Sequence, residues 1–312
     1  MTLPAPEVPV PGAPAARAPV DAYTTRVGLA SKRRRPGYRF LLHAAVILLV
    51  VAWLIPTLGL FINSFRPAAE VSSSGWWTSL LPPWDFTLDN YTHVLEQNNL
   101  GDAFINSLFI TIPSTVIPIL VASFAAYAFA WMSFPFKNAI FVAIVGLLVI
   151  PLQSTLIPVL RLLAGAGIAG EFLAVWLAHT GYGLPFAVFL LRNYMGGLPR
   201  EVFESASIDG ASHSTAFFRL AIPMSVPVLA SLAIFQFLFV WNDLLVSLIY
   251  IGPTNPENLP MTVVISNLVS SLGGETHFLT AAAFLTMILP LVVFILLQRY
   301  FVRGITGGAV KG

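Results

Sequence analysis

Apolar residues run along most of the chain in six long stretches, separated by shorter polar segments. Each stretch has roughly 20 or more residues, the length that crosses a hydrocarbon layer about 30 Å thick. The six stretches lie near residues 40–63, 104–131, 138–160, 171–195, 222–250 and 277–301. A backbone in lipid must satisfy its own hydrogen bonds, so each stretch is expected to be a helix. The pattern predicts an all-α integral membrane protein with six transmembrane helices.

The composition agrees with this pattern and excludes several classes of protein. Of the 312 residues, 57% are hydrophobic and 10% are charged, whereas soluble domains average about 25% charged residues. A single soluble domain and an ordinary disordered protein are therefore both excluded. The chain has no cysteine, which excludes disulfides, thiolate zinc sites and iron–sulfur clusters. Prolines inside the stretches, such as Pro151 and Pro227, predict kinks in the helices.

The chain divides into a tail, a membrane domain and a short end. Residues 1–39 are rich in proline and alanine and end in a basic cluster, so they are expected to form a disordered tail. The first apolar stretch is longer than the core of a signal peptide, and we expect it to be retained as a span. The membrane domain is predicted over 40–303, with its core at about 104–301, and 304–312 form a C-terminal tail.

The distribution of Lys and Arg predicts the orientation of the chain. With six spans, fourteen of the sixteen basic residues fall on the side of the two termini, and only Arg66 and Arg161 fall on the other. The positive-inside rule places both termini, and both tails, in the cytoplasm of a multi-pass plasma membrane protein. The long outer segment, about 65–103, carries Trp76, Trp77 and Trp84, which suit a membrane–water interface. A short surface helix is expected near Asn90–Gln97.

Motifs for nucleotide binding and for hydrolytic catalysis are missing. No G-x-x-x-x-G-K-[ST] loop, G-x-S-x-G elbow or H-E-x-x-H pair occurs. We therefore expect no catalytic residues, no metal site and no bound cofactor, and nothing indicates a nucleic-acid partner. His213 lies between two serines and is expected to belong to a solvent-facing polar cluster. The spans carry little charge beyond Asp243 and His179, which argues against an ion-coupled secondary transporter.

One inner loop, residues 192–221, is too polar to span and too apolar to be a linker. Pro199 can begin a helix, and Glu201 and Glu204 would fall in its first turns, where the helix dipole favours negative charge. Gly210 would allow a turn into a second short helix. Residues that can line one side or anchor the loop to the bundle are Phe203, Ala206, Ala211, Phe217 and Phe218. From these residues alone, docking onto a partner and lying on the lipid surface are equally good explanations.

The residues 204–211, which read ESASIDGA, followed by LAIP at 220–223, resemble the signature loop of ABC-importer permeases. That pattern is Glu-Ala-Ala, three residues, Gly, and an apolar–Pro pair further on; this chain has Ser205 and Ile222 where the family prefers Ala and Leu. Three further segments resemble the sugar importers of the maltose-transporter type, and within that branch the overall pattern is most similar to α-glucoside permeases. These segments are Thr87–Tyr91, Asn106–Leu108 and Trp241–Asp243.

The resemblance implies the smaller, six-span permease of a type I ABC sugar importer from a prokaryotic inner membrane. Its partners would be a second permease, two cytoplasmic ATPase subunits that bind ATP, an extracellular or periplasmic sugar-binding protein, and the surrounding lipid. The loop Glu204–Ala216 would couple the permease to the ATPase. The coupling residues implied are Phe203, Glu204, Ser205, Ala206, Ile208, Asp209, Gly210 and Ala211.

The pathway for solute is less clearly marked in the sequence. Asp243 would cost about 2.5–3.5 kcal/mol facing lipid, so it must face the bundle, a cavity or the outer interface. The candidates for pathway residues are Trp241, Asn242, Asp243, Gln236, Tyr182 and Gln153. Each is also open to a role in helix packing, and for Asp243 a structural role, as a partner of a polar group between helices or as a helix cap, is the favoured explanation. Transport of glycerol phosphate or a polyamine, a stand-alone channel and an intramembrane enzyme stay as alternatives.

Overall fold

The computed structural model describes residues 36–96, 99–252, 254–271 and 275–309. The predicted N-terminal tail, except for its last four residues, lies outside this part of the chain. The elements of the described part are all helices, and the chain falls into two units that divide after Ile55. Helix α1 (Pro36–Ser64), most of which belongs to the first unit, begins with a proline, which fits the first turn of a helix. Its apolar side chains from Phe40 to Ile55 are exposed, as suits contact with lipid.

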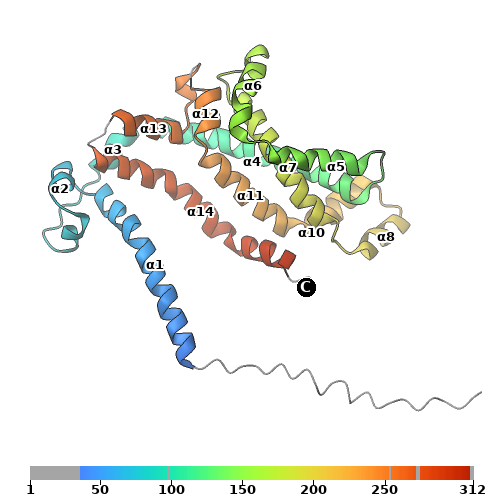
Figure 1. Cartoon of the computed structure of the whole chain (residues 1–312), viewed down its shortest axis with the longest axis horizontal. Coiled ribbons are helices and arrows are strands. Elements are labelled where there is room, and N and C mark those ends of the chain that lie inside the picture. Colours follow the sequence, from blue (N-terminus) through green and yellow to red (C-terminus); the bar gives the residue numbers. More distant parts are fainter. Residues whose placement is uncertain (1–35, 97–98, 253, 272–274, 310–312) are drawn as a thin grey trace, which may run out of the picture. The chain divides into compact units, whose positions relative to one another are not determined.

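Within the described residues, four helices are long and apolar enough to cross a membrane, and two bent pairs bring the possible number to six. The four are α1, α4 (Leu100–Trp131), α7 (Phe172–Met195) and α14 (Thr276–Ala309). In the second unit α4 packs along α7, and α11 (Val226–Trp241) packs against both α4 and α14 (Figure 1). Alanines such as Ala122, Ala126 and Ala187 are fully buried and allow this close approach.

The third predicted span is not one continuous helix. Helix α5 (Lys137–Gly146) and the short η3 (Leu147–Val149) meet α6 (Leu152–Gly165) at an angle of 105°. Ile150 takes an extended conformation because the ring of Pro151 disfavours a helical residue before it. Proline therefore bends this span much more sharply than an ordinary kink.

The fifth predicted span, 222–250, starts earlier than expected and is interrupted twice. Helices α9 (His213–Ala216), η4 (Phe217–Ala221) and α10 (Ile222–Met224) lead into α11 with a bend of 73°. Pro223 and Pro227 lie on either side of this bend, and neither has an N–H for a helical hydrogen bond. After Trp241 the chain breaks again, and α12 (Leu245–Tyr250) follows.

Arg66 organises the segment that follows α1. Its side chain is fully buried, and its guanidinium donates to Asn63, Ser74 and the carbonyl of Glu70. These bonds fold α2 (Ala68–Ser73) and η2 (Trp76–Leu80) around the cation. The expected short helix is confirmed as α3 (Asp89–Glu96), which packs against α14, and its place at the membrane surface stays a prediction. The short η5 (Pro256–Asn258) and the helix α13 (Met261–Ser271) precede α14.

Candidate functional site

The loop that carries the family signature folds as two short helices. Helix α8 (Arg200–Ile208) begins directly after Pro199 and has Glu201 in its first turn. The turn after it contains Gly210, whose φ of +79° lies in the left-handed region that favours glycine. The Ser212 hydroxyl then caps α9 by accepting the N–H of Thr215 at 3.2 Å. The predicted helix start and glycine turn are thus confirmed.

One aromatic residue anchors α8 to the membrane bundle. The Phe203 ring is only 8% exposed and stacks on the indole of Trp131, with ring centroids 3.9 Å apart. The Trp131 N–H donates to the carbonyl of Met195 at the end of α7, at 3.1 Å. Phe203 therefore faces the bundle, and its implied role in coupling stays a prediction in which its ring would act by anchoring α8.

The opposite face of α8 is open. Glu204, Ser205 and Asp209 are exposed, and Ile208 is 87% exposed, which is unusual for a large aliphatic side chain. Ala206 and Ala211 are half-buried beneath this face. An open apolar side chain between carboxylates is typical of a surface that another protein covers.

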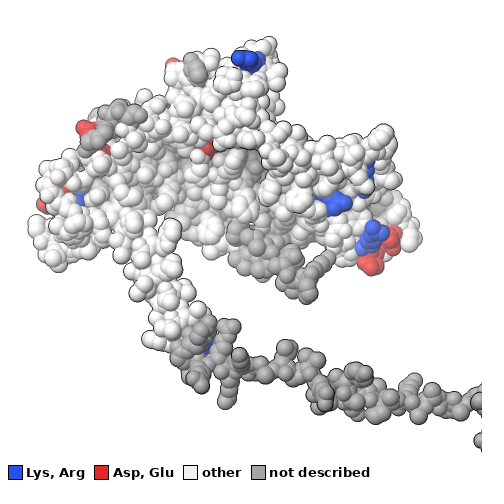
Figure 2. Space-filling view, in the orientation of Figure 1, with Lys and Arg blue, Asp and Glu red and all other residues white. Residues whose placement is uncertain are grey.

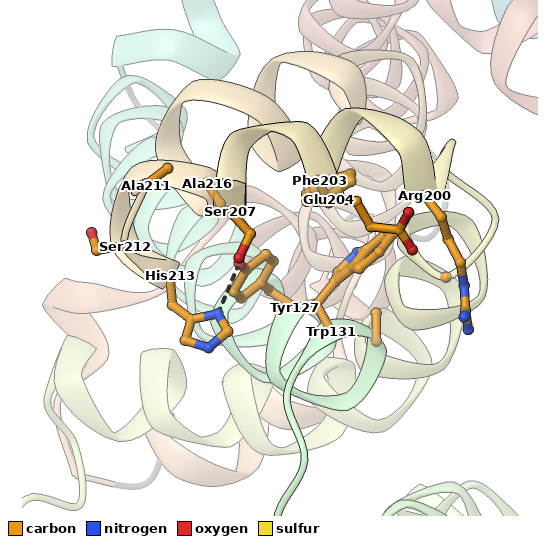
Figure 3. Close-up of a pocket in the computed structure, with 12 residues that line it drawn as sticks. Tyr127, Trp131, Arg200, Phe203, Glu204, Ser207, Ala211, Ser212, His213 and Ala216 are labelled. Carbon is orange, nitrogen blue, oxygen red and sulfur yellow. Dashed lines mark hydrogen bonds between the residues drawn. The ribbon is translucent and has the colours of Figure 1, made fainter. Parts of the chain in front are cut away.

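A groove of about 500 Å³ separates α8 from the end of α4 (Figure 3). Trp131 and Tyr127 form its floor, while Arg200, Glu204 and His213 lie at its rim. The Tyr127 hydroxyl and Nδ1 of His213 are 3.4 Å apart, so α9 is also attached to α4. His213 falls within the predicted coupling loop Glu204–Ala216 and is exposed, as expected, whereas Trp131 was not predicted to belong to this site. Only the position of Trp131 at the end of a span, where a loop must dock, could have indicated its role.

The anchoring role predicted for Phe217 and Phe218 is half confirmed. Phe217 is buried and stacks on Phe124 of α4 with ring centroids 4.6 Å apart. Phe218 touches the same rings edge-on but is 60% exposed. Because the two are neighbours on one helical turn, only one of them can point into the bundle.

Charged side chains gather near α8. Figure 2 shows most of the visible bundle as uncharged, with acidic and basic atoms together at the corner formed by α8. The acidic residues of this corner are Glu201, Glu204 and Asp209, and Arg200 lies beside them. The corner is thus a charged surface on an otherwise largely uncharged face of the described chain.

The predicted pathway residues do not form one cluster. Trp241 is buried, and its N–H donates to the carbonyl of Thr286 on α14 at 3.0 Å. Gln236 is buried over Gly183 of α7 and donates to the carbonyl of Ser114 on α4. Both side chains are therefore used in helix packing, which was the alternative role for them.

The other four candidates lie in two settings. Asp243 caps α12 by accepting the N–H groups of Val246 and Ser247, and the Tyr182 hydroxyl meets that of Tyr250 at 2.7 Å. These two are therefore tied to α12. Asn242 and Gln153 are exposed, and they are the predicted candidates that stay open to solvent or solute.

Comparisons with known proteins agree with this arrangement. The family described as "Binding-protein-dependent transport system inner membrane component" matches residues 104–307. The chain is 55% identical to the osmoprotective compounds uptake permease protein GgtD of Synechocystis over 86% of this chain and 91% of that one. It is 39% identical to the alpha-glucoside transport system permease protein AglG of Rhizobium meliloti, over 89% and 99% of the two chains.

A solved structure shares the fold. The crystal structure of a bacterial ABC transporter that imports the acidic polysaccharide alginate contains a chain similar to this one, with a TM-score of 0.73 and 20% identity. The match covers 86% of this chain and 98% of that one. The bent spans and the signature loop described above thus have the type I ABC-importer permease fold. The chain belongs to the family of binding-protein-dependent transport system inner membrane components and is a permease, not itself an enzyme.

Proposed function

We propose that this permease forms, with a second permease, the pathway for an uncharged polyhydroxylated solute. The proposed solute is a di- or oligosaccharide, an α-glucoside or a related osmoprotective compound. Two ATPase subunits would drive transport through α8, and a binding protein would deliver the solute from the outside. The observation that carries the proposal is α8 itself, which is anchored to the bundle through Phe203 and exposes Ile208 on its surface.

The geometry of α8 suits transmission of movement. A coupling element must be attached firmly to the part that it moves, because it biases the bundle only through a free-energy difference between two states. The stack of Phe203 on Trp131 and the contact of His213 with Tyr127 both attach the loop to α4. Ile208, Glu204 and Asp209 stay free for the driving subunit. Burial of one such aliphatic side chain yields about 1.5–3 kcal/mol.

The charge inside the bundle supports an uncharged solute. Among the described residues at membrane depth, His179 and Asp243 face each other at 3.7 Å. A polyamine would need a carboxylate that is free for it, and glycerol phosphate would need a free cation. The carboxylate of Asp243 is already used by the cap of α12. The relatives' names support sugars, since AglG is named for alpha-glucosides and AraQ of Halalkalibacterium halodurans, 32% identical, for arabinooligosaccharides.

The orientation proposed from the Lys and Arg count places α8 and both termini in the cytoplasm. The chain has no cysteine, so single cysteines can be introduced and labelled without background. A membrane-impermeant thiol reagent should label Ser205→Cys only after the membrane is opened, and Glu257→Cys in intact cells. The reverse pattern would refute this orientation.

Substitution on the open face of α8 tests the coupling. Glu204→Lys and Ile208→Asp should each abolish uptake and the recovery of ATPase subunits with the purified permease, while the amount of inserted permease stays normal. The matched control is Glu257→Lys, which reverses the charge of an exposed residue in η5 and should leave ATPase recovery unchanged. Normal ATPase recovery with both α8 variants would reject α8 as the coupling element.

Uptake by cells that lack the gene decides the solute class. Loss of uptake of α-glucosides, oligosaccharides or an osmoprotective compound, with restoration by the wild-type gene, is expected. Loss confined to glycerol phosphate or a polyamine would replace the proposed solute. Movement of solute by the purified chain alone, without nucleotide, would instead show a stand-alone channel.

A further inference from the structure

Asp243 lies at the break between α11 and α12 and joins three elements there. Its carboxylate accepts the N–H of Val246 at 3.3 Å and that of Ser247 at 3.1 Å, which caps α12. Its backbone carbonyl accepts the hydroxyl of Thr262 on α13 at 2.6 Å. The position of this one residue therefore sets where α12 begins relative to α11 and α13.

His179 of α7 faces the same carboxylate. Its Nε2 lies 3.7 Å from Oδ2 of Asp243, and its side chain is fully buried. Neither ring nitrogen has a hydrogen-bond partner among the described residues. A buried imidazole without a partner is unfavourable, and 3.7 Å is only about half an ångström beyond the usual N–H···O limit of about 3.2 Å. A small movement of α12 toward α7 would close this bond.

A second polar contact lies one helical turn further along the same faces. Tyr182, three residues after His179, meets the Tyr250 hydroxyl at 2.7 Å, and Thr155 of α6 donates to the Tyr182 hydroxyl at 3.2 Å. Residues three apart on a helix share a face. The surrounding interface between α7 and α12 is apolar and includes Val175, Val246 and Ile251. One hydrogen bond, between Tyr182 and Tyr250, therefore holds the end of α12 against α7, while the polar pair His179 and Asp243 at its start is 3.7 Å apart.

The other side of α12 is loosely packed. A hollow of about 440 Å³ lies between α6, α12 and α13, lined by Ile157, Leu160, Leu248, Gly252 and Val263 among others. This hollow is open to the surface of the chain rather than enclosed. The six-residue α12 is therefore not fully covered by described side chains on the side that faces away from α7.

We propose that His179 is a positioning residue for transport. Its imidazole holds Asp243, and with it α12, against α7; the bond between them closes in one state of the transport cycle and opens in another. A contact that differs between two states is what allows one state to be favoured. Asp243 then acts on the pathway through the helix break rather than as a ligand of the solute. This inference rests on the proposed function, because it assumes that the chain takes part in a transport cycle.

The distance between α7 and α12 can be measured directly in the assembled transporter. Spin labels at Leu177→Cys and Leu248→Cys, both exposed in this chain, report it in nanodiscs. Asp243→Asn removes the charge but keeps an equally good helix cap, and His179→Phe removes the imidazole. Asp85→Asn, an exposed aspartate of the outer segment, is the matched control. If Asp243→Asn is not recovered as a complex, Asp243→Ser, which also caps, replaces it.

The wild type and the control should give one narrow distance without nucleotide. His179→Phe and Asp243→Asn should each shift or broaden it toward longer distances, and the double variant should match the single variants because the two groups act as one unit. An unchanged distribution in either single variant, or additive effects in the double variant, would overturn the inference. Absence of any nucleotide response in the wild type would instead contradict the proposed function, and the resting distances could still be compared.

Discussion

The ring of Phe203 in α8 lies nearly parallel to the indole of Trp131 in α4, with an angle of 19° between the planes and 3.9 Å between the centroids. Trp131 is in turn bonded to the end of α7 through the carbonyl of Met195. One aromatic stack therefore joins the exposed loop to the two helices that pack most closely in the bundle. A displacement of α8 by a bound subunit would reach α4 and α7 through this contact.

Removal of the stack should separate binding of the ATPase from its effect. In Phe203→Ala the open face with Ile208 and Glu204 is unchanged, but α8 loses its anchor. Truncation of a buried Phe costs about 3–5 kcal/mol, so we expect α8 to lose its fixed position on the bundle and uptake to fall at least tenfold. Recovery of the ATPase with the permease should persist, because the open face of α8 is unchanged. The measurement is ATP hydrolysis and uptake by the same reconstituted complex.

Phe203→Trp is the control for this variant because it keeps an aromatic ring on Trp131. It should retain most of the uptake that the alanine variant loses. Equal uptake in Phe203→Ala and the wild type would show that the stack does not transmit movement.

The sequence predicted the parts of this fold that depend on local rules. The helix start at Pro199, the turn at Gly210 and the surface helix α3 follow from backbone preferences that neighbouring residues decide. The apolar stretches likewise predicted the spans. The 105° bend at Pro151 was not predicted, because a proline shows where a helix is weakened but not how far tertiary packing turns it.

The side-chain environments could not be read from the sequence. Trp241, Gln236 and Phe203 were assigned to the pathway or to a partner because of their chemistry and position in motifs. The structure uses the first two to join α11 to α14 and α4, and the third to join α8 to α4. Which side of a helix meets which neighbour is set by contacts more than 40 residues apart, and one sequence carries no direct record of them.

The backbone at Gly210 gives a prediction with an internal control. No described atom lies within 4 Å of a Cβ added there, so only its φ of +79° restricts substitution. Gly210→Val should therefore distort the turn between α8 and α9 at a cost of about 1–2 kcal/mol, and uptake should be lost. Gly210→Asn should retain much more uptake, since Asn tolerates this conformation. Equal loss in both variants would point to a side-chain clash with the bound ATPase rather than to backbone strain.

Gly183 allows α7 and α11 to approach each other. A Cβ at this position would lie 2.7 Å from Oε1 of Gln236, which is closer than such contacts occur. Gly183→Ala should lower the midpoint of thermal unfolding of the purified complex by several degrees. Combining it with Gln236→Ala should restore part of the loss, because the shorter side chain leaves room for the new methyl group. No restoration in the double variant would show that the helices are held apart by other contacts.

Arg66 provides the clearest expectation for the outer segment. Its guanidinium has no exposed surface and bonds to Asn63, Ser74 and Glu70, so it fixes three parts of the chain at once. Arg66→Met should leave the carbonyls and hydroxyls of this network without donors and release residues 66–81, since a buried polar group left without its hydrogen bond costs about 1–3 kcal/mol. Limited proteolysis of the reconstituted complex should then cut within this segment, while the wild type stays intact.

Arg66→Lys should also be cut, because an ammonium group cannot reproduce the planar fork of donors. Arg161→Met, at an exposed position of α6, is the matched control and should resist cleavage; protection of Arg66→Met to the same degree would show that α2 and η2 hold their fold without the cation.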